Sequence, residues 1–540
     1  MTAKLRELSI VLLLATTVTV LMTWPLAFKI GRLGRIDNGD GNLSIWNVAW
    51  VARTLVVDPM HVFDANIFYP HKNTLAYSES NLGAGALAIP AYWATKNPFT
   101  AHNFAVLFGF VLTATGTYYL VRRLTADRGA AAASAVCFAF TPYVFAHTAH
   151  IQLLMTAGLP FSMWMFHRFT DKVSLGRGAA LGAVMAAQAL SCGYYGVFVI
   201  LMIGYAAVVI AMMRRWWGSA PYWLGLTTGA VVSALLVLPA FLPYRTLQRV
   251  QGFHRELAQA RLYSSNWSDY FASSSYVHVR MLAWLPPWVE VVFPGFVAGG
   301  FGVAAFWIGR TRQRRELLAI YGGLALLACW ASFGPAGGLY TALYETLPPF
   351  AWLRAPARFG LIVAFALSVL AGAAISSFAQ RFSKPCLAGA ILALAAGVEL
   401  LVPSNLREFG GFEPVYRTLA TLPKAPVIEL PFYYLEGMFP LHTRYMLNST
   451  THWMPLVNGY SDYIPPDFVA NVMTLAPFPT RPAMKLLEPL KVRYAVFHMY
   501  GYNAENRHEI EVRLEELGQY FRPLYADEGT RLYEIVGFPP

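Results

Sequence analysis

The sequence contains few charged residues. Asp, Glu, Lys and Arg make up 13% of its 540 residues, whereas 56% are hydrophobic. Soluble globular chains carry about 25% charged residues, so this shortage of charge excludes an ordinary soluble protein. Residues 8–28 and 178–213 contain no charge at all, and about 20 apolar residues are enough for a helix to cross the hydrocarbon of a membrane. The sequence therefore predicts an α-helical polytopic membrane protein.

Cysteine is also scarce, and its placement excludes two kinds of site. The four cysteines fall inside or at the edge of apolar runs: Cys137, Cys192, Cys329 and Cys386. Their spacing matches neither a zinc site nor a disulfide framework. The sequence also lacks an internal repeat and shows no charge near the centre of any predicted membrane span. Repeats and midplane charges are typical of transporters, so a transporter or flippase is the less favoured class.

The charges that are present gather in short loops between apolar runs. The formal net charge is +12, but Lys and Arg in such loops set the orientation of a membrane protein, so we expect no nucleic-acid partner. About eleven membrane helices are predicted: 8–28, 102–121, 129–146, 151–169, 178–193, 195–213, 221–243, 291–309, 316–334, 358–378 and 385–402. With the N-terminus in the cytoplasm, every cytoplasmic loop is basic. Counting residues 82–94 as a span would reverse this pattern, so we expect a helix in the outer interface there.

Three regions are then predicted to face the outside: 29–101, 244–290 and 403–540. Charges return from Arg407 onward. Two short strands at 427–430 and 492–497 and a polar helix at 509–517 are predicted there. We expect two domains. Residues 1–402 form the transmembrane domain with both outer loops, and residues 403–540 form a small α/β extracytoplasmic domain.

Carboxylates of the first outer loop are the leading candidates for catalysis. Asp37 and Asp40 lie in a Gly-rich turn just before an amphipathic helix predicted to carry Trp46 at the lipid interface. A carboxylate there can deprotonate an acceptor hydroxyl, or bind a divalent cation (Mg²⁺ or Mn²⁺) that bridges phosphate oxygens. Glu79 is a second acidic candidate in the same loop. The alternative for all three acids is a hydrated loop without catalytic function.

Two histidines form a candidate substrate or metal site. His147 and His150 flank the outer end of the fourth predicted helix, and their spacing would place both on one helical face. They can hydrogen-bond a phosphate, or ligate a metal together with Asp37 and Asp40. The spacing fixes no third ligand. Polar residues at a helix end are the alternative.

A pair of arginines suggests a binding site for an anionic headgroup. Arg354 and Arg358 lie on the predicted outer side, in a segment rich in proline and aromatic residues. Guanidinium groups bind phosphate oxygens in a bidentate manner, which suits a phosphate or diphosphate headgroup. Side chains that extend to the membrane surface from a helix end are the alternative.

Several short motifs together resemble one known family. They lie at 39–41, 68–70, 118–124, 140–143 with the two histidines, 293–295, 353–359 and 457–461. With these motifs, the chain resembles GT-C-type membrane glycosyltransferases, in the broad bacterial group that includes the YfhO-like proteins. The resemblance covers nearly the whole chain.

The resemblance implies an inverting transferase of the bacterial inner membrane. It implies that the sugar donor is linked to a polyprenyl phosphate, and that the sugar passes to an envelope glycan, lipid or protein on the extracytoplasmic face. The first-loop acid then corresponds to Asp40, with Asp37 as the second choice. Paired acids in some members are adjacent, whereas here three positions separate them. The alternatives are a lipid or oligosaccharide flippase and a non-catalytic protein of envelope assembly.

Overall fold

The computed structural model describes residues 3–251, 255–286, 289–308 and 311–540. Parts of two predicted segments lie outside the described residues: 252–254 and 287–288 of the outer loop, and the last residue of the predicted helix 291–309. The chain forms two compact units. Their segments are Met1–Phe28 with Ala105–Asn405, and Lys29–Phe104 with Leu406–Pro540. The predicted outer loop 29–101 thus folds with the C-terminal segment, whereas the sequence analysis attached it to the membrane domain.

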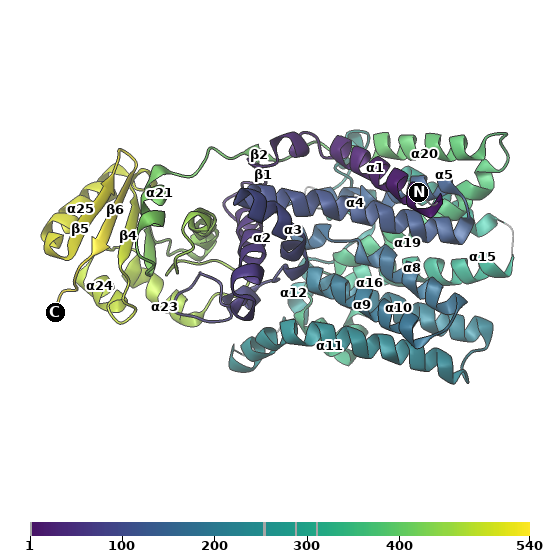
Figure 1. Cartoon of the computed structure of the whole chain (residues 1–540), viewed down its shortest axis with the longest axis horizontal. Helices are drawn as coiled ribbons and strands as arrows, with labels where there is room; N and C mark the ends of the chain where they lie inside the picture. The colour runs from purple at the N-terminus through teal and green to yellow at the C-terminus, as the bar shows by residue number, and fades with distance from the viewer. Residues whose placement is uncertain (1–2, 252–254, 287–288, 309–310) are drawn as a thin grey trace. The chain divides into compact units, whose positions relative to one another are not determined.

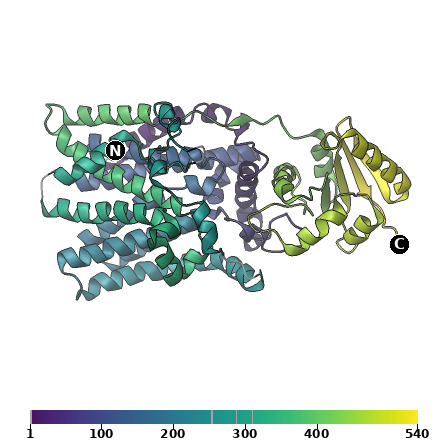
Figure 2. The same ribbon diagram turned by 180° about the vertical axis from the view of Figure 1, so that it is seen from behind.

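The first unit consists of helices (Figures 1 and 2). Its longer helices are α1 Ala3–Met22, α4 Pro98–Thr125, α5 Arg128–Ala139, α8 Gly158–Asp171, α9 Leu175–Ser191, α10 Gly193–Arg214, α11 Ala220–Gln251, α14 Phe296–Ala304, α16 Gly323–Ser332, α18 Leu339–Thr346, α19 Gly360–Ala379 and α20 Pro385–Glu399. Shorter helices connect them: α6 Pro142–Ala146, α7 Ile151–Leu154, α12 Leu257–Leu262, α13 Val279–Leu282, α15 Arg312–Leu317 and α17 Gly334–Gly337. A helix lies at each of the predicted membrane positions.

Among the described residues, six helices are long and apolar enough to cross a membrane by length and composition. They are Ala3–Met22, Pro98–Thr125, Arg128–Ala146, Gly193–Arg214, Ala220–Arg249 and Pro356–Ala379. Phe296–Trp307 and Pro385–Glu399 are shorter apolar helices. The chain is therefore a helical membrane protein, while the predicted number of about eleven spans stays a prediction.

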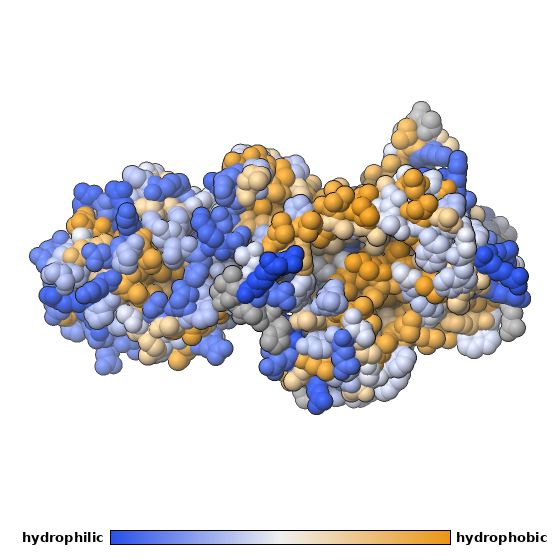
Figure 3. Space-filling view, turned by 90° about the horizontal axis from the view of Figure 1, so that it is seen from below, coloured by the Kyte–Doolittle hydropathy of each residue, from blue (hydrophilic) through white to orange (hydrophobic). Residues whose placement is uncertain are grey.

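Close helix contacts in this unit depend on glycine. Helices α9 and α11 lie side by side in both ribbon views (Figures 1 and 2). A Cβ atom on Gly178 would lie 2.0 Å from the carbonyl oxygen of Gly225, and one on Gly182 would lie 2.1 Å from that of Gly229. Small residues let the two backbones touch, which is the usual way to join helices in lipid. On its other faces α11 exposes leucines such as Leu235, and apolar side chains are prominent over this unit in Figure 3.

The second unit combines two distant parts of the sequence. The first loop provides β1 Leu33–Gly34, α2 Asp40–Val57 and α3 Leu82–Thr95. The C-terminal segment provides β2 Arg407–Glu408, α21 Pro414–Thr421, β3 Val427–Leu430, α22 His442–Asn448, α23 Pro466–Leu475, α24 Arg481–Leu487, β4 Tyr494–His498, α25 Ala504–Glu516, β5 Phe521–Ala526 and β6 Thr530–Ile535. Strands β1 and β2 pair in antiparallel register. Backbone bonds from Phe68 to Asn458 and between Asn66 and Leu456 join the same two parts.

A four-stranded mixed sheet organises the C-terminal part. Its order is β3-β4-β6-β5, with β3 and β4 parallel and the remaining pairs antiparallel. The predicted strand 427–430 coincides with β3, while the predicted strand 492–497 is shifted to β4, and the polar helix 509–517 corresponds to α25. The sequence analysis missed β5 and β6. All four residues of the edge strand β3 and all five of the inner strand β4 are buried, so this side of the sheet is covered on both faces.

Candidate functional site

The turn that precedes α2 is held by Asp37. Its Oδ1 accepts hydrogen bonds from the backbone N–H groups of Gly39 (3.2 Å) and Gly41 (3.0 Å), while its Oδ2 lies 3.3 Å from Nε of Arg35. The first N–H groups of a helix have no partner within the helix, so Asp37 stabilises the start of α2. Both carboxylate oxygens of Asp37 are thus engaged within the turn.

Asp40 occupies a different position in this turn. It is the first residue of α2 and the acidic residue of the first turn. The N-terminal end of a helix stabilises negative charge, because the unpaired N–H groups point toward it. Of the two acids, Asp37 therefore acts on the backbone, while the role of Asp40 as the catalytic carboxylate stays a prediction.

Gly41 is required by the same turn. A Cβ atom there would lie 1.9 Å from the carbonyl oxygen of Arg35, far inside van der Waals contact. The chain before the helix passes directly against its first turn, so only glycine fits at this position. The second glycine of the Gly-Asp-Gly motif is thus required by the turn. The close contact of Gly41 with Arg35 also fixes the backbone next to Asp40.

The loop that contains Glu79 docks onto the same helix. The backbone carbonyl of Glu79 accepts hydrogen bonds from the side-chain amides of Asn47 (3.2 Å) and Asn81 (3.3 Å). Asn47 follows Asp40 by seven residues, which is about two helical turns or roughly 10 Å along the same face of α2. The structure therefore brings the Glu79 loop to the helix face that begins with Asp40.

Buried asparagines line this region, and the sequence analysis did not select them. Asn42, Asn47 and Asn81 are 2%, 2% and 5% exposed. In the described part of the chain, their side-chain oxygens accept no hydrogen bond. Buried polar atoms normally have a partner, so these three amides add unused acceptors close to the acids. No sequence signal marks them, because asparagine is equally common in exposed turns.

Trp46 lies in the core of this unit, which corrects the expected lipid-facing position. It is 1% exposed, and its indole N–H donates to Oδ1 of Asn66 at 3.2 Å. Trp50, one turn later, is 7% exposed and donates to the carbonyl of Val62. Both indoles are thus packed within protein instead of facing lipid. A role for Trp46 in substrate binding stays a prediction, in an environment typical of a core residue.

His147 and His150 belong to a turn instead of one helical face. His147 directly follows α6. The backbone N–H of His150 donates to the carbonyl of His147 at 2.9 Å. The ring of His147 bonds the carbonyl of Tyr143 through Nδ1 at 2.7 Å. Removal from water, together with the charge of Arg358, lowers the pKa of His147 to about 4, although the hydrogen bond to Tyr143 acts in the opposite direction. His147 is therefore neutral near pH 7, and because its Nδ1–H donates to the carbonyl of Tyr143, its Nε2 can only accept a hydrogen bond.

Both arginines lie over aromatic rings. The guanidinium of Arg358 is 4.3 Å from the ring centre of Tyr194, and that of Arg354 is 5.5 Å from that of Tyr263. The hydroxyl of Tyr194 accepts hydrogen bonds from the backbone N–H groups of Arg354 and Ala355, which fixes the segment before α19. Within the first unit the structure thus brings Arg358 near His147, while the role of these side chains in binding stays a prediction.

A divalent cation was a further prediction for Asp37, Asp40, His147 and His150. In residues 3–251, 255–286, 289–308 and 311–540, no group of three or more His, Cys, Asp or Glu side chains is arranged to hold a metal ion. Oδ1 of Asp37 is already engaged by the helix start, and its Oδ2 accepts from Arg35. The predicted cation stays a prediction.

Comparison with known proteins identifies the fold. No family model and no curated protein sequence matches the chain. The structure of ArnT from Cupriavidus metallidurans in the apo state is 14% identical, with a TM-score of 0.50, and the match covers 100% of both chains. ArnT bound to undecaprenyl phosphate gives 14% identity and a TM-score of 0.49, over 99% of this chain and 98% of that one. A third structure is archaeal oligosaccharyltransferase AglB from Archaeoglobus fulgidus, in complex with an inhibitory peptide and a dolichol-phosphate. Its sequence identity is 14% and its TM-score is 0.47, and the match covers 98% of this chain and 74% of that one. The chain therefore has a GT-C-type fold.

Proposed function

We propose that the chain is an inverting glycosyltransferase of the bacterial inner membrane. It moves a sugar from a polyprenyl-phosphate donor to an envelope glycan, lipid or protein on the extracytoplasmic face. The observation that carries the proposal is the position of Asp40, at the start of a buried helix in a protein with the GT-C-type fold. A helix start held by Asp37 and Gly41 gives Asp40 a fixed backbone.

In the proposed reaction, Asp40 acts as the general base. Its carboxylate takes the proton from an acceptor hydroxyl, and the hydroxyl oxygen attacks the anomeric carbon of the donor sugar. The bond from that carbon to the phosphate oxygen breaks as the glycosidic bond forms, and its electron pair leaves with the polyprenyl phosphate. Attack from the face opposite the phosphate inverts the anomeric configuration. General-base assistance of this kind contributes about 10²–10⁴ in rate.

Arg354 and Arg358 are proposed to bind the donor phosphate. Two guanidinium groups neutralise charge on the leaving phosphate, and their planar donors match its oxygens. Their support by Tyr194 and Tyr263 holds both groups in place before the donor binds. His147 lies near Arg358, and its Nε2 is proposed to accept a hydrogen bond from a hydroxyl of the donor sugar. No step is assigned to the predicted cation.

The experiment that tests the proposal uses the full chain in lipid vesicles. Polyprenyl-phosphate sugars with a labelled sugar are incorporated in the same vesicles, together with an extract of envelope glycans and lipids as acceptor. We expect release of polyprenyl phosphate in step with labelled product. Movement of the intact donor between leaflets without cleavage would instead indicate a flippase and contradict the proposal.

A further inference from the structure

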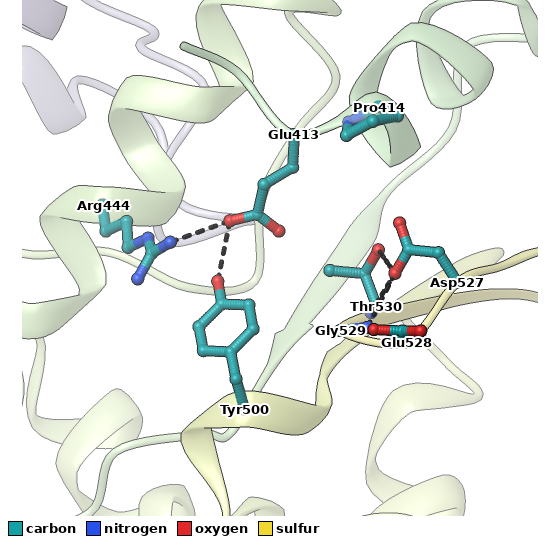
Figure 4. A pocket seen from close by; sticks show the side chains of 8 residues that line it. All are labelled: Glu413, Pro414, Arg444, Tyr500, Asp527, Glu528, Gly529 and Thr530. Atoms are coloured by element: carbon teal, nitrogen blue, oxygen red, sulfur yellow. Dashed lines mark hydrogen bonds and ion pairs between the residues drawn. The ribbon is translucent and has the colours of Figure 1, made fainter. Parts of the chain in front are cut away.

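A polar pocket lies in the C-terminal part of the second unit, outside the proposed catalytic residues. Its volume is about 550 Å³, within the range of about 300–1,000 Å³ that is usual for small-molecule sites. Figure 4 shows Glu413, Arg444 and Tyr500 on one side of it and the turn 527–530 on the other. Three carboxylates and one guanidinium line the pocket, so its charge is net negative.

The first wall is a hydrogen-bonded group of three side chains. Oε1 of Glu413 accepts from the guanidinium of Arg444 at 2.8 Å and from the hydroxyl of Tyr500 at 2.7 Å. The same guanidinium lies 4.9 Å from the ring centre of Tyr500. Arg444 has five N–H donors, so this contact leaves further donors for a ligand.

A buried pair supports this wall from behind. His498 is 1% exposed and bonds Oε2 of Glu413 at 3.1 Å through Nδ1 and Oε2 of Glu429 at 2.8 Å through Nε2. Glu429 is fully buried, and Tyr416 donates to it at 2.9 Å. A buried charged network is costly to build, and such networks beside a pocket are candidates for a functional site. The hydrogen bond from His498 fixes the orientation of the Glu413 carboxylate toward the pocket.

The opposite wall is a rigid turn. Oδ1 of Asp527 accepts from the backbone N–H groups of Gly529 (2.9 Å) and Thr530 (2.6 Å), and its Oδ2 accepts from the hydroxyl of Tyr525 (2.7 Å). Glu528, at the tip of the turn, is exposed. Both walls are therefore formed before any ligand arrives, which lowers the entropic cost of binding.

We propose that this pocket binds one or two neutral or amino-sugar units of a glycan. Each sugar hydroxyl is both a donor and an acceptor, and the pocket offers carboxylate acceptors beside guanidinium donors. An anionic ligand such as a phosphate or a uronic acid is disfavoured, because the single guanidinium is already paired with Glu413. Identifying the bound sugar as part of the acceptor rests on the proposed function, whereas the binding itself does not.

The test is a glycan array probed with the full-length chain in lipid nanodiscs that contain no sugar detergent. The array carries neutral, amino-sugar, uronic-acid and phosphorylated glycans. We expect binding to neutral or amino-sugar glycans, and at least tenfold weaker binding by Arg444→Gln. Glu528→Lys should weaken amino-sugar binding more than neutral-sugar binding. Glu516→Lys, the same charge change on an exposed residue of α25 away from the pocket, should bind as the wild type does.

Several outcomes would overturn the inference. They are the absence of any glycan signal, a preference for acidic glycans, and binding that Arg444→Gln leaves unchanged. Unfolding midpoints for each variant exclude loss of the fold, and Glu528→Lys alters an exposed side chain at the tip of its turn. The array carries no polyprenyl-phosphate donor, so its signal reports binding and not transfer. The failure of this inference is thereby distinguishable from failure of the proposed transfer.

Discussion

Asp37 and Asp40 occupy different positions at the start of α2, although only three positions separate them in sequence. Asp37 bonds two backbone N–H groups at the start of α2, and Asp40 is the first residue of that helix. The sequence suggested Asp40 because a glycine-flanked acid before an amphipathic helix is visible without a structure. It did not suggest Asn47 or Asn81, because these residues meet the Glu79 loop only through tertiary folding.

Gly41→Ala should destabilise the protein. The added methyl group would overlap the carbonyl of Arg35, so the turn before α2 must shift. Forced overlap of this kind costs about 1–3 kcal/mol. The measurement is the thermal unfolding midpoint of the full chain in nanodiscs. Gly176→Ala is the matched control, because a Cβ there meets no atom within 4 Å, and Ala in a helix is more stable than Gly by up to about 1 kcal/mol. Equal midpoints for both variants would contradict the role given to Gly41.

Arg354→Lys and Arg358→Lys should each weaken binding of the lipid phosphate by about tenfold. Lys keeps the charge but lacks the planar fork that pairs with two phosphate oxygens. Polyprenyl phosphate binding to each variant in nanodiscs is the measurement. Arg381→Lys, an exposed arginine after α19, serves as the control. Unchanged affinity in both test variants would leave these side chains with only a structural role at the membrane surface.

At the scale of elements, the buried His498 links strand β4 to β3 and to the pocket wall. Burial alone would lower the pKa of His498, but its hydrogen bonds to Glu413 and Glu429 raise it above the ordinary value of 6.5. Burial alone would likewise raise the pKa of the Glu413 carboxyl, but its bonds to His498 and Tyr500 bring it below the ordinary range. The folded protein therefore holds a charged pair across this wall.

This pair predicts a dependence of stability on pH. The folded state holds the His498 proton more tightly than the unfolded state does, so its contribution is complete below pH 6.5 and is lost as pH rises through the raised pKa. The unfolding midpoint should therefore decrease as pH rises above 6.5. His498→Gln should remove this part of the slope. A midpoint that rises over this range in the wild type would contradict the assignment.

The strands show where prediction from sequence succeeds and where it fails. Strand β3 was predicted with its correct bounds, because its three apolar residues lie in a short segment between two prolines. The first residues of β5 are mostly exposed or half-buried, and it contains Pro523, so it lacks such a run. The pairing of β1 with β2 joins residues far apart in sequence, and no local pattern encodes it.

At the scale of the whole molecule, the predicted orientation has a direct test. The N-terminus should be cytoplasmic and the segment after residue 403 extracytoplasmic, as in the positive-inside pattern. In a Cys386→Ser background, which removes the exposed cysteine, Gly410→Cys should react with an impermeant thiol reagent added from outside. Gly176→Cys should react only after the membrane is opened. Both positions have open space for a side chain. Labelling of Gly176→Cys from outside would contradict the predicted topology, and with it the extracytoplasmic face proposed for catalysis.

The measurement that tests the central claim most directly is sugar transfer by Asp40→Asn. Asn keeps the shape of Asp40 but cannot take a proton, so transfer from a polyprenyl-phosphate sugar in reconstituted vesicles should fall by about 10²–10⁴. Donor binding and the unfolding midpoint should stay near those of the wild type. Asp37→Asn should lose less activity, because an amide oxygen can still accept the bonds of the helix start. Full transfer activity in Asp40→Asn would contradict the account, and Glu79 would then be the acid to test.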